Sequence, residues 1–213
     1  MTRGPATVGV VEQANAAVLV TLDAGGELLD RRRVELTGAG LSTHPHHHEG
    51  SWAVGRYLDS PWARPTALAD ALALVERVRA AASVGARDAL AALAAAVPVP
   101  IGGVAIRACP VLPPTTEERI RDHRAQTVAD SVMYREALAA AAEARGWRVC
   151  WYDRERVPQE AAAAVGGGDV DTLLRAMGRA AGPPWQAAHR LAAAAALAAA
   201  GHGGRAGGDA SSG

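Results

Sequence analysis

Short apolar runs rich in β-branched residues open the chain. The segments Thr7–Gln13 (TVGVVEQ) and Ala16–Leu22 (AAVLVTL) are separated by only two residues, a spacing typical of a β-hairpin. A Gly-Gly pair at 25–26 supplies the positive φ angle of a tight turn, and the strand-like ELLDRRRVEL at 27–36 follows it. The pattern therefore predicts three antiparallel strands.

The third of these segments carries three consecutive arginines. Successive side chains of a strand point to opposite faces, so Arg31 and Arg33 share one face with Leu29 and Glu35. Arg31 and Arg33 are candidate phosphate-binding residues, although a strand face open to water is the simpler interpretation.

Helical periodicity and two further apolar runs follow. Thr66 is the predicted N-cap of helical sequence that continues to Pro98 in two stretches. The short apolar run VAIRAC at 104–109 favours a buried parallel strand. A capping box at 115–118 predicts a helix that reaches Arg145, about thirty residues and roughly 45 Å long.

WRVCWYD at 147–153 predicts a fifth strand, joined to the fourth through that long helix. Such a crossover is what a parallel pair of strands needs. Met133 and Trp147 are expected in the core, and further helices are expected at the C-terminal end. The pattern as a whole predicts an α/β fold with a mixed five-stranded sheet, a long crossover helix and C-terminal helices.

The 213 residues are enough for one large domain, predicted over 1–201, with a Gly-rich disordered tail at 202–213. The 22 basic residues, all arginine, balance 22 acidic ones, so no global field attracts nucleic acid or an anionic membrane. The abundance of arginine and alanine is typical of a GC-rich genome. Any attraction to an anion must therefore be local, through the planar donor fork of clustered arginines.

Cysteine usage and hydropathy indicate a cytoplasmic protein. Cys109 and Cys150 lie on separate strand-like segments and form no CxxC pair, so buried thiols of a reducing compartment are expected. The N-terminal sequence lacks the apolar core of a secretory signal, and charged residues interrupt the alanine runs before they reach membrane-spanning length.

A long connection at 38–65 holds the stretch THPHHHEG. On an extended segment, histidines two residues apart, such as His44 and His46, project to the same side. The metal-ligand candidates are His44, His46, His47, His48 and Glu49. The alternative is a polar recognition loop in which histidines bond to backbone groups and stack on Trp52 or Tyr57. Under this alternative, any Zn²⁺ bound by the histidines is adventitious.

The predicted long helix carries a polar stripe. His123, Gln126, Asp130 and Tyr134 follow one another at helical spacing, with Arg135 next to them. A polar stripe on a helix that packs against a sheet must face a cleft or find partners. Tyr134 and Arg135 are therefore candidate binding residues, and the simpler alternative pairs Asp130 with an arginine.

GPPW at 182–185 predicts a rigid turn between helices. Arg179 and His189 flank it and could reach the same cleft, so Arg179 is a further candidate binding residue. No nucleotide-cofactor motif is present: neither a P-loop, a GxGxxG after a strand nor a GxSxG elbow occurs.

The predicted order of strands and helices resembles the ribonuclease H-like fold of ribonucleases, resolvases and transposase cores. Active members hold two divalent ions, Mg²⁺ or Mn²⁺, on acidic residues from the first strand, the fourth strand and flanking helices. The resemblance makes Glu12 a candidate catalytic carboxylate, and Asp130 of the polar stripe is the second candidate. The resemblance also has two departures, since Arg107 and His189 stand where carboxylates are expected.

Segments such as LLDRRRVELTGAGLSTHPHHHEGSW and AMGRAAGPPWQAAHRLAAAAALA also resemble a family of uncharacterised bacterial, mostly actinobacterial, proteins. Two hypotheses follow. The first is a divergent protein for nucleic-acid processing or binding, and if it is an enzyme, a divalent-metal nuclease. The second is a noncatalytic interaction or regulatory protein that binds a protein partner through loop 43–62.

Overall fold

The computed structural model describes residues 4–206, which fold around a five-stranded mixed sheet. The strands are β1 (Ala6–Gln13), β2 (Ala16–Leu22), β3 (Leu28–Glu35), β4 (Ile101–Arg107) and β5 (Arg148–Tyr152). Their order across the sheet is β3-β2-β1-β4-β5. The pairs β1–β2 and β2–β3 are antiparallel, whereas β1–β4 and β4–β5 are parallel. The predicted strand types and directions are confirmed.

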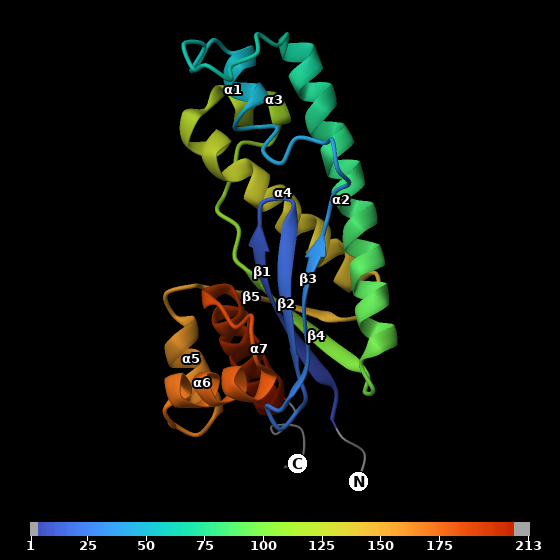
Figure 1. The fold of residues 1–213 in the computed structure, drawn as a ribbon, viewed down its shortest axis with the longest axis vertical. Helices are drawn as coiled ribbons and strands as arrows, with labels where there is room; N and C mark the ends of the chain where they lie inside the picture. The colour runs from blue at the N-terminus through green and yellow to red at the C-terminus, as the bar shows by residue number, and fades with distance from the viewer. Residues whose placement is uncertain (1–3, 207–213) are drawn as a thin grey trace.

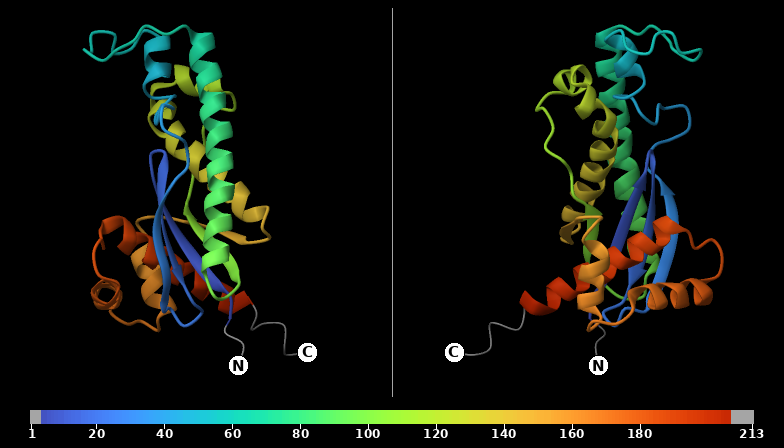
Figure 2. Two further views of the ribbon diagram at one scale, coloured as in Figure 1. Left: turned by 45° about the vertical axis from the view of Figure 1, so that its right-hand side comes forward. Right: turned by 90° about the vertical axis from the view of Figure 1, so that its left-hand side faces the viewer.

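Helices cover both faces of the sheet (Figure 1). They are α1 (Glu49–Ala53), α2 (Leu68–Ala96), α3 (Thr116–Arg121), α4 (His123–Glu143), α5 (Val157–Ala164), α6 (Val170–Ala181) and α7 (Ala187–Ala206). α2 and α4 pack on one face and extend beyond the sheet, where α1 and α3 lie beside them (Figures 1 and 2). α5, α6 and α7 pack on the other face.

Each face has its own apolar core. The first joins the sheet to α2 and α4 and contains Met133 and Trp147, as predicted from the sequence. The second joins Val18, Val20 and Leu22 of β2 to the alanine-rich side of α7 and to Leu174 of α6. β1 and β4 are central, so their carboxyl ends come together between the two helical layers.

Close backbone contact sets the position of α7. A Cβ atom on Gly9 of β1 would lie 1.7 Å from the carbonyl oxygen of Ala192. Small residues on both elements therefore let α7 lie directly against the central strand. This contact places the beginning of α7 near the carboxyl end of β1.

Three helix boundaries differ from the predicted ones. Asp122 divides the predicted thirty-residue helix into α3 and α4, because its extended backbone ends α3 and its carboxylate accepts from the N–H groups of Arg124 and Ala125. Thr66 does not cap α2, since its hydroxyl donates to the carbonyl of Arg64. The two helical stretches predicted up to Pro98 are one helix.

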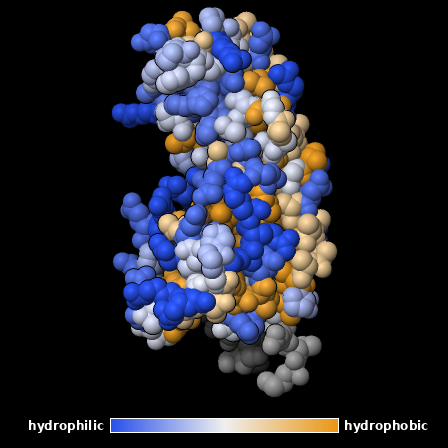
Figure 3. Space-filling view, in the orientation of Figure 1, coloured by the Kyte–Doolittle hydropathy of each residue, from blue (hydrophilic) through white to orange (hydrophobic). Residues whose placement is uncertain are grey.

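At the C-terminal end, α7 continues to Ala206, beyond the predicted limit of 201. The rest of the predicted tail, 207–213, lies outside the described residues. Along residues 4–206, no helix combines the length and the hydropathy needed to cross a bilayer. Hydrophilic residues cover most of the face shown in Figure 3.

Candidate functional site

The carboxyl ends of the three parallel strands bring together charged side chains. Glu12 lies at the end of β1, Arg107 is the last residue of β4, and Tyr152 is the last residue of β5. Arg107 pairs in register with Tyr152. The Tyr152 hydroxyl donates to the carbonyl oxygen of Val10 at 3.0 Å, so it ties β5 to β1 across β4. Ligand sites of open α/β sheets lie at such an edge.

Arg135 reaches this edge from α4. Its guanidinium forms an ion pair with Glu12 and donates at 3.1 Å to the carbonyl oxygen of Ala108. The two side chains of the pair are only 6% and 9% exposed. The buried Nε of Arg135 has no hydrogen-bond acceptor among the described residues. Arg135 therefore links the ends of β1 and β4 and keeps one donor unused.

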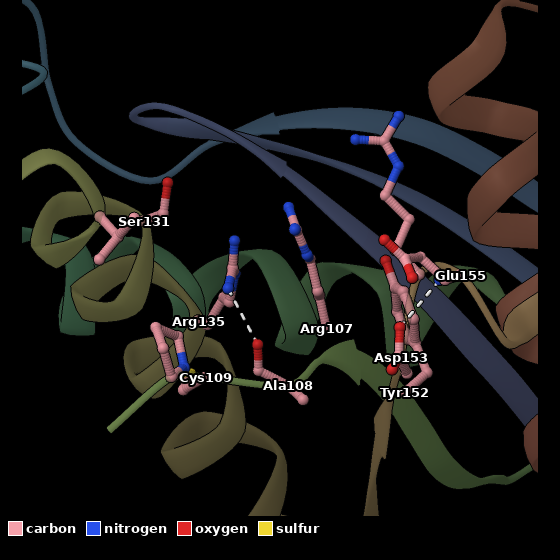
Figure 4. Close-up of a pocket in the computed structure, with 11 residues that line it drawn as sticks. Arg107, Ala108, Cys109, Ser131, Arg135, Tyr152, Asp153 and Glu155 are labelled. Carbon is pink, nitrogen blue, oxygen red and sulfur yellow. Dashed lines mark hydrogen bonds between the residues drawn. The ribbon is translucent and has the colours of Figure 1, made fainter. Parts of the chain in front are cut away.

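Two adjoining hollows of about 480 Å³ each open at this edge and share the residues Arg107, Tyr152 and Arg154. One extends toward α4 and is also lined by Cys109, Ser131, Arg135, Asp153 and Glu155. The other extends toward α7 and is also lined by Glu12, Gln13, Ala187, Ala188 and Leu191. Figure 4 shows Arg107 between Arg135 and Tyr152, with the guanidinium groups of both arginines directed to the same side.

Two titratable side chains at this edge, Tyr152 and Cys109, have raised pKa values. Burial, followed by the charge of Glu12, raises the pKa of Tyr152 above its ordinary value. Burial also raises the pKa of Cys109, against the opposing effect of Arg135. The side chains of Cys109 and Cys150 are half-buried, not fully buried as predicted. Tyr152 and Cys109 are therefore neutral near pH 7.

The candidate carboxylate Asp130 lies elsewhere, under the histidine loop. Its Oδ1 accepts from the backbone N–H of His46 at 3.0 Å and from the His46 ring Nδ1 at 2.8 Å. Its Oδ2 accepts from the backbone N–H of His47 at 3.0 Å. The predicted alternative that Asp130 pairs with an arginine is wrong, because loop donors already satisfy the buried carboxylate.

Other members of the polar stripe also bind the connection between β3 and α2. Gln126 Oε1 accepts from Ser51 at 2.9 Å and from Arg56 at 3.1 Å. The Tyr134 hydroxyl donates to the carbonyl of Thr43 at 3.1 Å. The His123 ring shares a 2.8 Å hydrogen bond with the exposed Tyr57. The stripe therefore finds its partners in the loop and anchors it.

The histidine cluster is divided between the interior and the surface. His46 is fully buried with Asp130, whereas the rings of His44 and His47 lie 5.2 and 5.4 Å from that of His48. His48 in turn stacks on Trp52. Glu49 accepts a hydrogen bond from Ser42. Within residues 4–201, whose side chains the structure describes, no group of three or more His, Cys, Asp or Glu side chains is arranged to hold a metal ion.

The remaining candidate residues lie outside the hollows. Arg31 donates to four successive carbonyl groups, those of Ala181, Gly182, Pro183 and Pro184, and so fixes the turn between α6 and α7. Arg33 pairs with Glu35 on the exposed face of β3. Arg179 is exposed in the last turn of α6.

His189 also serves the turn before α7. It stacks on Trp185 and accepts from the backbone N–H of Gln186 at 3.2 Å. Burial, followed by the charge of Arg31, lowers the pKa of His189. The residues that α7 does contribute to the hollow are apolar ones.

The donors at the strand ends do not fit a pair of divalent ions. Such ions need several converging carboxylates. Here Glu12 is already neutralised by Arg135, β4 contributes Arg107, and α7 contributes Ala187 and Ala188. Asp130 is bound by loop residues. The edge holds guanidinium groups in the region where the fold's active members place metal ligands.

The sequence patterns do not predict Arg154 and Tyr152 as site residues, and they mark Arg107 only as a departure from an expected acid. A sequence signal existed for all three. Each lies at the end of a predicted parallel strand or just beyond it, where ligand-binding groups of α/β sheets gather.

Comparison with known proteins identifies the fold. No protein-family profile and no curated protein sequence matches the chain. The structure is similar to that of Thermus thermophilus RuvC in complex with Holliday junction substrate, at 15% identity and a TM-score of 0.53, over 95% of this chain and 96% of that one. A second Thermus thermophilus RuvC structure gives 13% identity and a TM-score of 0.48, over 94% and 96%. The α/β fold is ribonuclease H-like, as the sequence predicted.

Proposed function

We propose that this protein binds nucleic acid at the carboxyl ends of β1, β4 and β5 and does not cleave it by a two-metal mechanism. The observation that carries the proposal is the gathering of three arginines, Arg107, Arg135 and Arg154, at this edge. Arg107 ends β4, and Glu12 is engaged by Arg135. Guanidinium groups bind phosphate well, with planar donors that suit its oxygens.

The fold adds support of a general kind. The similar RuvC structure contains a Holliday junction substrate, and a shared fold makes nucleic acid the first ligand to test. The balanced total charge of the chain means that binding must depend on the local arginines.

The test combines binding with cleavage. Labelled branched, duplex and single-stranded DNA are incubated with the protein and with Mg²⁺ or Mn²⁺, and are followed by fluorescence anisotropy and by denaturing gels. We expect retention of at least one DNA form without cleavage. Metal-dependent cleavage that the Glu12→Ala variant loses would contradict the proposal and restore the nuclease hypothesis.

The second candidate is a noncatalytic interaction protein that uses loop 43–62. The observation in its favour is the exposure of Tyr57, Leu58 and Trp62, with Trp62 at 74%. Under this alternative no DNA form is retained. Proximity crosslinking in the native host then yields a partner that Trp62→Ser loses and Arg107→Ala keeps.

A further inference from the structure

The hollow between β1 and α7 combines unpaired positive charge with open space. Arg107 is half-buried and Arg154 is exposed, and neither guanidinium group forms a hydrogen bond or an ion pair within residues 4–201. The acid that lines this hollow, Glu12, is already paired with Arg135. The two free guanidinium groups are therefore available to an anion that enters the hollow.

Arg135 already supplies a fixed cation at this edge. Its guanidinium contacts a carboxylate from the end of β1 and a carbonyl oxygen just after β4. Oxygen atoms of these two kinds are the ligands of a hard divalent cation. Arg135 is part of the chain, so a chelator cannot remove its charge. Because its side chain is almost fully buried, solvent screens that charge weakly.

Two acidic residues near this edge, Asp153 and Glu155, do not line the hollow between β1 and α7. They line the second hollow, on the α4 side. The Asp153 carboxylate accepts from the backbone N–H of Glu155 at 2.9 Å, which holds the turn after β5. Repulsion of an anion is therefore weaker on the α7 side.

The first turn of α7 lines the hollow and favours the binding of an anion there. Ala187 and Ala188 line the hollow, and their small side chains let a ligand approach the backbone closely. The beginning of a twenty-residue helix carries partial positive charge and free N–H groups. An anion in the hollow would meet this helix end on one side and the free arginines on the other.

We propose that Arg135 takes the place of a metal ion at the ends of β1 and β4, and that Arg107 and Arg154 bind a phosphodiester of the nucleic-acid backbone without any divalent cation. This inference rests on the proposed function and specifies its chemistry. The bound group is the charged phosphate, so recognition is independent of base sequence.

The first experiment measures anisotropy of the DNA form retained in the binding test, in EDTA and in Mg²⁺. The variants are Arg107→Ala, Arg154→Ala and Arg87→Ala, the last a control at an exposed arginine of α2. We expect equal native affinity in EDTA and Mg²⁺. Each hollow variant should weaken binding about tenfold and lower the slope of log affinity against log salt by about one. Arg87→Ala should bind as the native protein does.

Two competitors separate the possible sources of the phosphate. DNA with neutral methylphosphonate linkages should not compete, and inorganic phosphate should compete only weakly. Strong competition by inorganic phosphate would overturn the assignment to a backbone diester in favour of a free phosphate ligand.

The outcomes separate this inference from the proposed function. If the native protein retains no DNA, the proposed function fails. If native DNA binding persists but Arg107→Ala and Arg154→Ala bind normally, the proposed function stands and the site assignment falls.

A second measurement tests the role of Arg135 without using DNA. Thermal unfolding of the native protein and of Glu12→Gln is compared in EDTA and in Mn²⁺. We expect Mn²⁺ to leave the native melting temperature unchanged. A rise with Mn²⁺ that disappears in Glu12→Gln would mean that Glu12 binds metal, which would overturn the assignment of Arg135 as the resident cation.

Discussion

At the scale of single residues, buried charge is satisfied by backbone and ring donors from a distant loop. Asp130 is 3% exposed and accepts three hydrogen bonds from His46 and His47. A buried carboxylate without such donors would be strongly destabilising. The loop therefore depends on one side chain of α4 for its position.

Asp130→Asn tests this dependence. The amide that replaces the carboxylate has only one acceptor oxygen. Its NH₂ group would face an N–H donor of the loop, so two donors would meet without an acceptor. We expect a loss of about 2–3 kcal/mol of unfolding free energy, measured by urea denaturation. The control Asp88→Asn, on the exposed side of α2, should change stability by less than about 0.5 kcal/mol. Equal effects of the two variants would contradict the anchoring role.

At the scale of elements, close packing decides which helices can lie against the sheet. α7 packs its alanine-rich backbone against Gly9 of β1. α2 passes the end of β3 at Gly85, where a Cβ atom would lie 2.2 Å from the carbonyl oxygen of Leu36. Larger side chains at either glycine would separate helix from strand. The position of the candidate site follows from the first of these contacts, because it brings the start of α7 to the end of β1.

Gly9→Ala tests that contact. The added methyl group collides with backbone, which cannot move aside as a side chain could, so we expect a loss of about 3 kcal/mol. Gly38→Ala is the matched control, because nothing lies within 4 Å of a Cβ at that position. Thermal unfolding followed by circular dichroism measures both. A melting temperature for Gly9→Ala like that of the control would mean that α7 does not pack as described.

Elements that depend on local sequence signals were predictable, and those that depend on distant contacts were not. Strands were predictable because β-branched runs and turn residues are local signals, and the crossover helix followed from strand spacing. The break at Asp122 was not predictable, since helical periodicity continues through it. The partners of Asp130 and Glu12 depend on contacts across 84 and 123 residues, which no local pattern specifies.

At the scale of the whole molecule, the sheet is shared by two cores. One core lies under α2 and α4, and the other lies under α5, α6 and α7. Adjacent strands contribute to both, because side chains alternate between the faces. Val10 belongs to the first core and Val18 to the second, although their strands are hydrogen-bonded neighbours. Loss of either helical layer would expose one face of the same sheet.

This shared sheet predicts that the chain unfolds as one cooperative unit, and the same experiment tests the single domain expected from the sequence. Asp130→Asn weakens the α4 side and Gly9→Ala weakens the α7 side, so each should lower the midpoint of the same calorimetric transition. We expect the calorimetric and van't Hoff enthalpies to agree for the native protein and for both variants. Two transitions, with each variant shifting a different one, would instead mean that the helical layers fold independently and that the arginine edge joins two separate units.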